Sequence, residues 1–199
     1  MERDRFWSMS VFRKLFGPSK EEIWRQLSAE IGAQYVEGGF LRGGRVEARH
    51  EGWLVTLDNY AVSTGKTTIV FTRMRAPFEN RDGFRFRVYR KNIFSDIAKW
   101  FGMQDVAVGH EPFDTEFIIK GNDEARLRRL FADAEIRELI QRQPEIDFSV
   151  HHDEGWFSTT HPQGTDELLF RVVGVIKDVD RLKLLFELFA ETLDELHRG

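Results

Sequence analysis

The sequence contains no cysteine, and this absence excludes several kinds of site at once. Disulfide bonds, thiol catalysis and zinc sites with cysteine ligands all require that residue. A chain without cysteine suits the reducing cytosol, where disulfides are rare. We therefore expect a cytoplasmic protein.

Long apolar runs and an excess of one charge are also missing. No stretch approaches the roughly 18 apolar residues that a membrane-spanning helix needs. Charged residues interrupt the first 17 positions, so the N-terminus lacks the pattern of a signal peptide. The net charge of −4 gives no overall attraction for nucleic acid.

The composition that remains is that of a folded globular protein. Of the 199 residues, 41% are hydrophobic and 31% are charged. Eighteen phenylalanines dominate the aromatic content, which favours a well-filled core over disorder.

Residues 1–18 are expected to form an N-terminal extension that ends at Gly17-Pro18, and translation starts at either Met1 or Met9. Residues 10–17 place apolar side chains beside Arg13 and Lys14, a pattern that gives weak peripheral contact with an anionic membrane. The alternative is a frayed or locally docked terminus.

Hydrophobic periodicity predicts one helix and then strands in the first half of residues 19–199. Ser19 and Glu22 have the spacing of a capping box at a helix start, and Gly32 marks its end. Beyond it the apolar period changes to two, with short glycine turns between strand-like runs at 45–50, 53–60, 67–74 and 84–90. Such short connections favour an antiparallel meander of four or five strands.

The second half mixes helices and strands. Leu184 and Leu188 lie outside the main apolar stripe of the last helix, so its own sheet or a partner subunit covers a second side, which makes this helix a candidate homodimer contact. The fold class is α+β: mostly antiparallel meanders with segregated helices and a long C-terminal helix, in one domain, with a subdivision near 92–104 as the alternative. The expected elements are a helix near 93–102, a strand at 113–121, one or two helices in 122–143, strands at 146–152, 156–160 and 167–176, and a helix from Asp178 or Asp180 to Leu196.

The motif Gly65-Lys66-Thr67 has the ending of a phosphate-binding loop but not its beginning. The required first glycine would stand at position 60, which is Tyr60. A β-branched, strand-like run follows, so no helix N-terminus is available for phosphate. Gly65-Lys66 is predicted to be a hairpin turn.

An arginine-rich segment at 73–91 is the best candidate for a binding site. Seven basic and two acidic residues give it a local charge of +5. If the runs containing Arg73 and Arg75 and containing Arg85 and Arg87 pair as strands, four guanidiniums share one sheet face. They would repel one another unless carboxylates from elsewhere in the chain, an anionic ligand or an acidic protein partner met them. No nucleic-acid motif accompanies the segment, so nucleic acid is not expected.

Two histidine-containing segments are weaker candidates. His110 and Asp114 stand close together and suggest an acid–base pair, against a reading in which Asp114 binds backbone amides while neighbouring phenylalanines enter the core. The adjacent His151 and His152 point to opposite faces of a strand, so even with His161 they suggest a polar turn more than a metal site. We expect no metal and no cofactor.

Residues 109–140 resemble a segment of bacterial proteins that carry a domain of unknown function. The resemblance rests on F-D-x-x-F before a strand and an acidic residue with "EAR" before a leucine-rich helix, carried by Phe113, Asp114, Phe117, Asp123, Glu124, Ala125, Arg126, Leu127 and Leu130. It implies a bacterial protein and transfers no catalytic residue.

The sequence therefore favours a non-enzymatic binding or interaction module that uses an arginine-rich sheet face. The alternative is a metal-dependent or hydrolase-like enzyme centred on His110 and Asp114.

Overall fold

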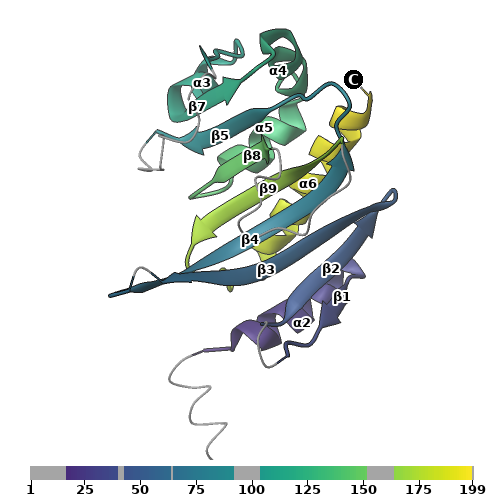
Figure 1. Cartoon of the computed structure of the whole chain (residues 1–199), viewed down its shortest axis with the longest axis vertical. Coiled ribbons are helices and arrows are strands. Elements are labelled where there is room, and N and C mark those ends of the chain that lie inside the picture. The colour runs from purple at the N-terminus through teal and green to yellow at the C-terminus, as the bar shows by residue number, and fades with distance from the viewer. Residues whose placement is uncertain (1–16, 40–42, 64, 92–103, 152–163, 199) are drawn as a thin grey trace, which may run out of the picture.

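The computed structural model describes residues 17–39, 43–63, 65–91, 104–151 and 164–198 (Figure 1). The helices are α2 (Lys20–Ile31), α3 (Glu111–Glu116), α4 (Glu124–Leu130), α5 (Ala134–Gln141) and α6 (Val179–Arg198). The strands are β1 (Gln34–Val36), β2 (Arg45–His50), β3 (Trp53–Ser63), β4 (Thr68–Glu79), β5 (Phe86–Arg90), β6 (Gln104–Asp105), β7 (Phe117–Gly121), β8 (Asp147–His151) and β9 (Thr165–Val173). The predicted α+β class is confirmed.

The nine described strands form one antiparallel sheet in the order β1-β2-β3-β4-β9-β8-β5-β7-β6. Strands β2, β3 and β4 follow one another as the first three strands of the predicted meander, and β1 pairs with the outer side of β2. Strand β9, which comes last in the chain, lies between β4 and β8 and joins the meander to the rest of the sheet (Figure 1).

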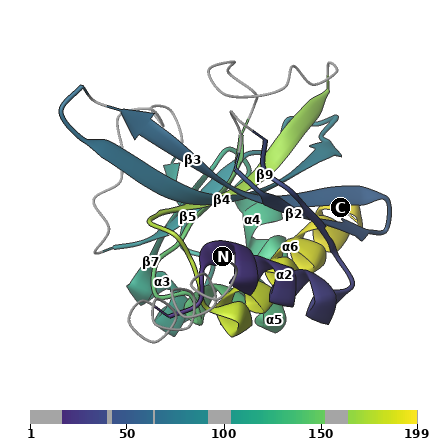
Figure 2. The same ribbon diagram turned by 90° about the horizontal axis from the view of Figure 1, so that it is seen from below.

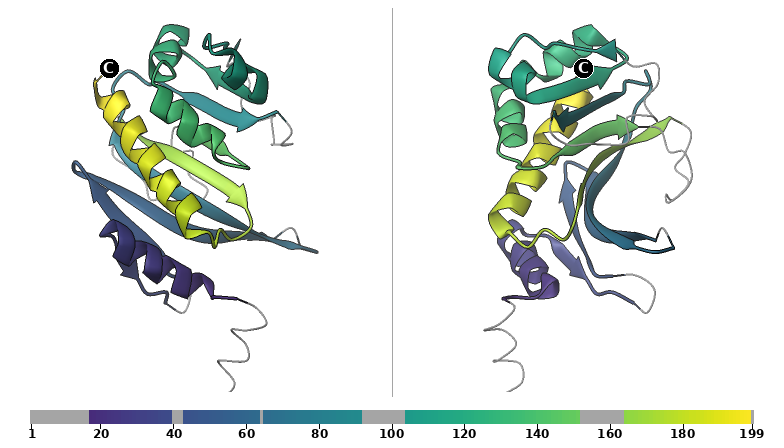
Figure 3. Two further views of the ribbon diagram at one scale, coloured as in Figure 1. Left: turned by 180° about the vertical axis from the view of Figure 1, so that it is seen from behind. Right: turned by 90° about the vertical axis from the view of Figure 1, so that its left-hand side faces the viewer.

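The helices gather on one face of this sheet (Figure 2). Helix α6 crosses that face between α2 and α5 and packs against both (Figure 3). Leu188 is fully buried and Leu184 packs against the core, so the chain itself covers the second side of α6. No described helix is long and apolar enough to cross a membrane. We call the opposite face of the sheet, which no described helix covers, the helix-free face.

Local signals in the sequence set several element boundaries. Ser19 accepts a hydrogen bond from the Glu22 amide, and the Glu22 carboxylate accepts one from the Ser19 amide, which completes the capping box of α2. Asp133 and Asp178 accept backbone N–H bonds at the starts of α5 and α6. Gly65 has a φ of 82° between two directly paired strands, which confirms the hairpin turn.

The predicted pairing of the two arginine-bearing runs is wrong, because β9 and β8 lie between β4 and β5. The chain leaves β4 at Asn80, whose buried side chain bonds both the carbonyl and the amide of Phe84 and also contacts Asp166. This turn sends the chain across the sheet instead of back along β4. Alternation specifies the face that a side chain takes, but it does not specify the neighbouring strand.

The predicted strand at 113–121 is wrong in its first half, where residues 111–116 form α3. Pro112 occupies the first turn of this helix, where a missing N–H does no harm. The strand itself, β7, begins at Phe117. The helix predicted near 93–102, the strand predicted at 156–160 and residues 10–16 of the membrane-contact segment lie outside the described residues.

Candidate functional site

Strand register gathers four arginines on the helix-free face. Residues directly opposite each other in neighbouring strands share a face, and Arg73 of β4 is opposite both Asp58 of β3 and Arg171 of β9. Arg75, two residues further along β4, lies on the same face. The register followed through β8 places Arg87 of β5 there as well.

Asp58 joins the two arginines of β4. Its carboxylate accepts two hydrogen bonds from Arg73, at 2.8 Å from Nε and 2.7 Å from Nη2. Arg75 reaches the same carboxylate at 3.3 Å and stands 3.9 Å from Glu167 of β9. The contacts of Arg75 are therefore longer than the 2.7–2.9 Å of a strong charge-assisted hydrogen bond.

Asp147, the first residue of β8, makes a second cluster of the same kind. Its carboxylate accepts bonds from Nε and Nη2 of Arg87 at 2.7 and 3.0 Å. Arg171 donates to it at 3.0 Å. The Arg87 side chain is only 2% exposed, whereas that of Arg171 is 40% exposed. Arg87 is thus a structural partner of Asp147, whereas Arg171, which also contacts Tyr60, remains partly exposed to solvent.

Each carboxylate holds its arginine in the charged form. Burial by itself lowers the pKa of Arg73, but the hydrogen bond and charge of Asp58 outweigh it, so the pKa is raised. The pKa of Arg171 is raised in the same way, with burial opposed by the charge and hydrogen bond of Asp147 and by Tyr60. Both groups carry full positive charge at any physiological pH.

Aromatic rings lie beside the arginines. Tyr60 and Phe71, opposite each other on β3 and β4, stack with ring centroids 5.1 Å apart. The Arg73 guanidinium lies 4.9 Å from the Tyr60 ring, and Arg87 lies 5.1 Å from the Tyr89 ring. These contacts keep the guanidinium planes in fixed orientations.

The charges of this set nearly balance. Four guanidiniums (Arg73, Arg75, Arg87 and Arg171) face three carboxylates (Asp58, Asp147 and Glu167), which leaves one positive charge in excess. Carboxylates of the chain itself therefore neutralise most of the positive charge on this face. We call these seven residues the arginine–carboxylate face.

Arg85, the fourth arginine predicted to lie on this face, is not part of the arginine–carboxylate face. It precedes β5 and is exposed, and its backbone amide and carbonyl bond to Asn122. The sequence thus predicted Arg73, Arg75 and Arg87 on one face, and the structure replaces Arg85 with Arg171.

Asp114 has a backbone-binding position in the structure. Its carboxylate accepts hydrogen bonds from the amides of Val108 (2.9 Å), Gly109 (2.9 Å) and His110 (3.1 Å). Phe113 and Phe117 on either side are 1% and 2% exposed and pack with their rings 4.7 Å apart. Both oxygens of Asp114 are thus engaged by the loop that precedes α3.

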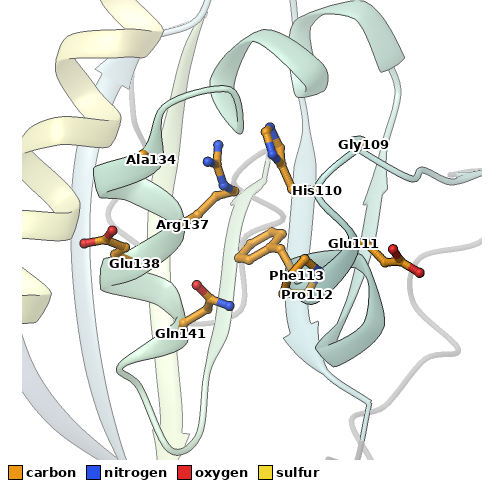
Figure 4. A pocket seen from close by; sticks show the side chains of 9 residues that line it. All are labelled: Gly109, His110, Glu111, Pro112, Phe113, Ala134, Arg137, Glu138 and Gln141. Atoms are coloured by element: carbon orange, nitrogen blue, oxygen red, sulfur yellow. The ribbon is translucent and has the colours of Figure 1, made fainter.

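His110 lines a cavity of about 390 Å³ between α3 and α5. Figure 4 shows the side chains of His110 and Arg137 pointing toward each other across it, while that of Glu111 points away. Arg137 also donates to the carbonyls of Phe131 and Asp133. No group of three metal-ligating side chains occurs among the described residues, and His152 and His161 lie outside them.

Comparison with known proteins gives a likeness of fold. No family model and no curated protein matches the chain. The crystal structure of the mycobacterial trehalose monomycolate transport factor A, TtfA, aligns with a TM-score of 0.51 at 10% sequence identity. The alignment covers 89% of this chain and 94% of that one. At this identity the likeness shows the fold alone.

Sequence reasoning missed Asp58, Asp147, Glu167 and Arg171. Each stands next to at least one apolar residue within or at the end of a predicted strand, which is the available signal for a charge on a sheet face. What the sequence does not show is that β9 pairs with β4 and β8 pairs with β9, which brings Arg171, Glu167 and Asp147 to this face.

Proposed function

We propose that this protein is a bacterial, cytoplasmic, non-enzymatic binding module whose arginine–carboxylate face holds an acidic protein partner. The supporting observation is the state of Arg75 and Arg171, diagonal neighbours on β4 and β9. The contacts of Arg75 are long, and Arg171 is 40% exposed. A guanidinium has five N–H donors in a planar fork, so both retain capacity for a carboxylate.

The shape of this region favours a macromolecule over a small anion. The arginine–carboxylate face extends over β3, β4, β9, β8 and β5, and the cavity of about 390 Å³ lies elsewhere, beside α3 and α5. A broad face with alternating charges recognises a complementary surface through several exposed contacts, each of modest strength. Nucleic acid is not proposed, because the excess is a single positive charge and condensed phosphates demand many.

The test uses poly-L-glutamate as an acidic polypeptide and inorganic phosphate as a small anion. The double variant Arg75→Gln/Arg171→Gln removes two charges from the face. We expect it to weaken poly-L-glutamate binding roughly tenfold, or about 1.4 kcal/mol, in fluorescence anisotropy at low salt. The control Arg129→Gln/Arg142→Gln removes the same charge from exposed positions of the helix layer. Equal loss in both variants would reduce the effect to net charge and refute the proposal.

One observation supports the alternative enzyme centred on His110 and Asp114, namely the cavity that His110 lines. Because Asp114 is committed to three backbone amides, His110 would have to act with Arg137 or Gln141 instead. A hydrolase screen with chromogenic phosphate and acyl esters tests this candidate. Activity that disappears in His110→Ala while the melting temperature holds would support it over the binding module.

A further inference from the structure

The hairpin of β3 and β4 extends beyond its neighbours (Figure 1). On one side, β2 pairs with β3 only as far as Leu57. On the other side, β9 pairs with β4 only as far as Phe71. The pairing between β3 and β4 continues to Ser63 and Thr68. Residues Asn59–Ser63 of β3 therefore form a strand edge with which no described strand pairs.

The backbone of this edge has outward-facing hydrogen-bonding groups. The Val70 carbonyl of β4 accepts a bond from the Gly174 amide, so it faces away from β3. In an antiparallel pair, the residue opposite such a position also turns its N–H and C=O outward. Ala61 is opposite Val70, so its N–H and C=O face outward at this edge, as do those of Asn59 and Ser63 two residues away.

This edge lacks the protection that the ends of the sheet have. The outermost strands β1 and β6 are three and two residues long, and β6 ends in a charged residue, Asp105. Short and charged edges discourage pairing with another chain. The five residues Asn59–Ser63 include no charge and no proline. The earlier part of β3, up to Leu57, is paired with β2.

We propose that a second copy of this protein pairs with this edge, two-fold and antiparallel, to form a sheet continuous across two subunits. Centred on Ala61, the two-fold axis sets Ala61 opposite its own copy and Asn59 opposite Ser63 on both sides. Each of these pairs exchanges two N–H···O=C bonds. Tyr60 then stands opposite Val62, an aromatic and a β-branched side chain, which is a favourable cross-strand pair.

The segment itself argues for a second copy over another chain. Its sequence is self-complementary in this register: the one large side chain, Tyr60, meets the smaller Val62, and the two polar ends meet each other. Without charges, it sets up no repulsion between identical strands. A two-fold interface of this kind joins the same patch on both subunits and closes without further growth.

The absence of cysteine makes the register measurable. Ala61→Cys puts one thiol in each chain, opposite its own copy, at a Cα separation of about 5.5 Å for a hydrogen-bonded pair. That distance lies within the range of about 4.4–6.8 Å that a disulfide spans. Thr68→Cys, on the β4 side of the same hairpin, is the matched control. Oxidation uses copper phenanthroline in air and is followed by non-reducing electrophoresis.

We expect the unmodified protein to sediment as a concentration-dependent dimer and Ala61→Cys to form covalent dimers at least tenfold faster than Thr68→Cys. The variant Val62→Lys, which puts a charge on the edge, should sediment as a monomer while its circular dichroism and melting temperature match those of the unmodified protein. A monomer at all concentrations overturns the proposal. So does a dimer that survives Val62→Lys and cross-links equally at both positions, since it would use another surface. Neither result depends on poly-L-glutamate binding by the arginine–carboxylate face.

Discussion

Arg73 and Arg87 show how a sheet face can hold charge without helices to cover it. Their side chains are 15% and 2% exposed, so each is largely removed from water. A buried charge is tolerated only when a partner of opposite sign and hydrogen bonds replace the lost hydration. Asp58 and Asp147 supply both with two-point geometry.

Replacing Asp58 tests this dependence. Asp58→Asn keeps the shape but removes the charge that two arginines share, so the largely buried Arg73 is left with a weaker acceptor. We expect a loss of about 1–3 kcal/mol in the free energy of unfolding, measured by urea denaturation. The control is Glu79→Gln, which breaks a fully exposed pair with Arg81 and should change nothing measurable. Equal effects would mean that the face gains no stability from burial of its charges.

Asp114 makes the second prediction at this scale. Asp114→Asn replaces one acceptor oxygen with an NH2 group among three backbone N–H donors. We expect a loss of about 1–3 kcal/mol in unfolding free energy, because at least one amide loses its acceptor. Glu111→Gln, an equal charge change at an exposed neighbouring position, is the control. A stable Asp114→Asn variant that nevertheless loses a measured activity would restore the catalytic hypothesis.

Among the elements, α6 contains a buried hydroxyl without a hydrogen bond in the described structure, at Thr192, where a substitution is expected to stabilise the protein. Thr192 is fully buried, and its hydroxyl has no hydrogen-bond partner among the described residues. Thr192→Val has nearly the same shape without the unsatisfied group, so we expect a gain of about 1 kcal/mol in unfolding free energy. Thr115→Val, at an exposed helical position, should bring no gain. A loss in Thr192→Val would reveal a partner for the hydroxyl.

The ionised carboxylate of Glu191, near the contact between α5 and α6, lowers the stability of the fold in a pH-dependent way. Burial raises the pKa of Glu191, and the nearby carboxylates of Glu135, Asp194 and Asp133 raise it further, while Arg198 opposes them. A raised pKa means that the protonated side chain favours folding, so this contribution is complete at low pH and is lost as pH rises through the folded-state pKa.

Glu191→Gln mimics the protonated form. It should raise the melting temperature at about pH 7, and the difference from the unmodified protein should vanish at about pH 3.5, below the usual glutamate pKa of about 4.3. Differential scanning calorimetry at both pH values measures this. Glu187→Gln, exposed on the same helix, controls for net charge. A difference that grew toward low pH would contradict the assigned sign.

Elements whose boundaries depend on local chemistry were predictable. The capping residues Ser19, Asp133 and Asp178 and the turn at Gly65 act over three or four residues, so the sequence shows them directly. The turn at Asn80 was not predictable, because its side chain is fixed by Asp166, a residue 86 positions away. Most of the arginine–carboxylate face was not predictable for the same reason. Asp58 reaches Arg73 within the β3–β4 hairpin, but Arg171, Glu167 and Asp147 join the face only through the long-range pairing of β9 and β8.

For the whole molecule, β9 is the strand on which cooperativity depends. It pairs with β4 of the meander and with β8 of the second half, so it connects two parts of the sheet that share no other strand pairing in the described chain. Phe170 at its centre is fully buried and stands opposite Met74 on one side and Phe148 on the other. If the chain were divided into two domains near 92–104, their boundary in the sheet would have to lie at β9.

Phe170→Ala tests whether the sheet unfolds as one unit. Removing this ring leaves a cavity at the junction, and we expect a loss of about 3–5 kcal/mol in unfolding free energy. If the domain is single, hydrogen exchange should accelerate in β3 and β8 alike, and tryptophan fluorescence and circular dichroism should give coincident transitions. Val173→Ala, at the 64% exposed end of the same strand, should have little effect. Two separate transitions, with only one shifted by Phe170→Ala, would instead show two folding units that meet at β9.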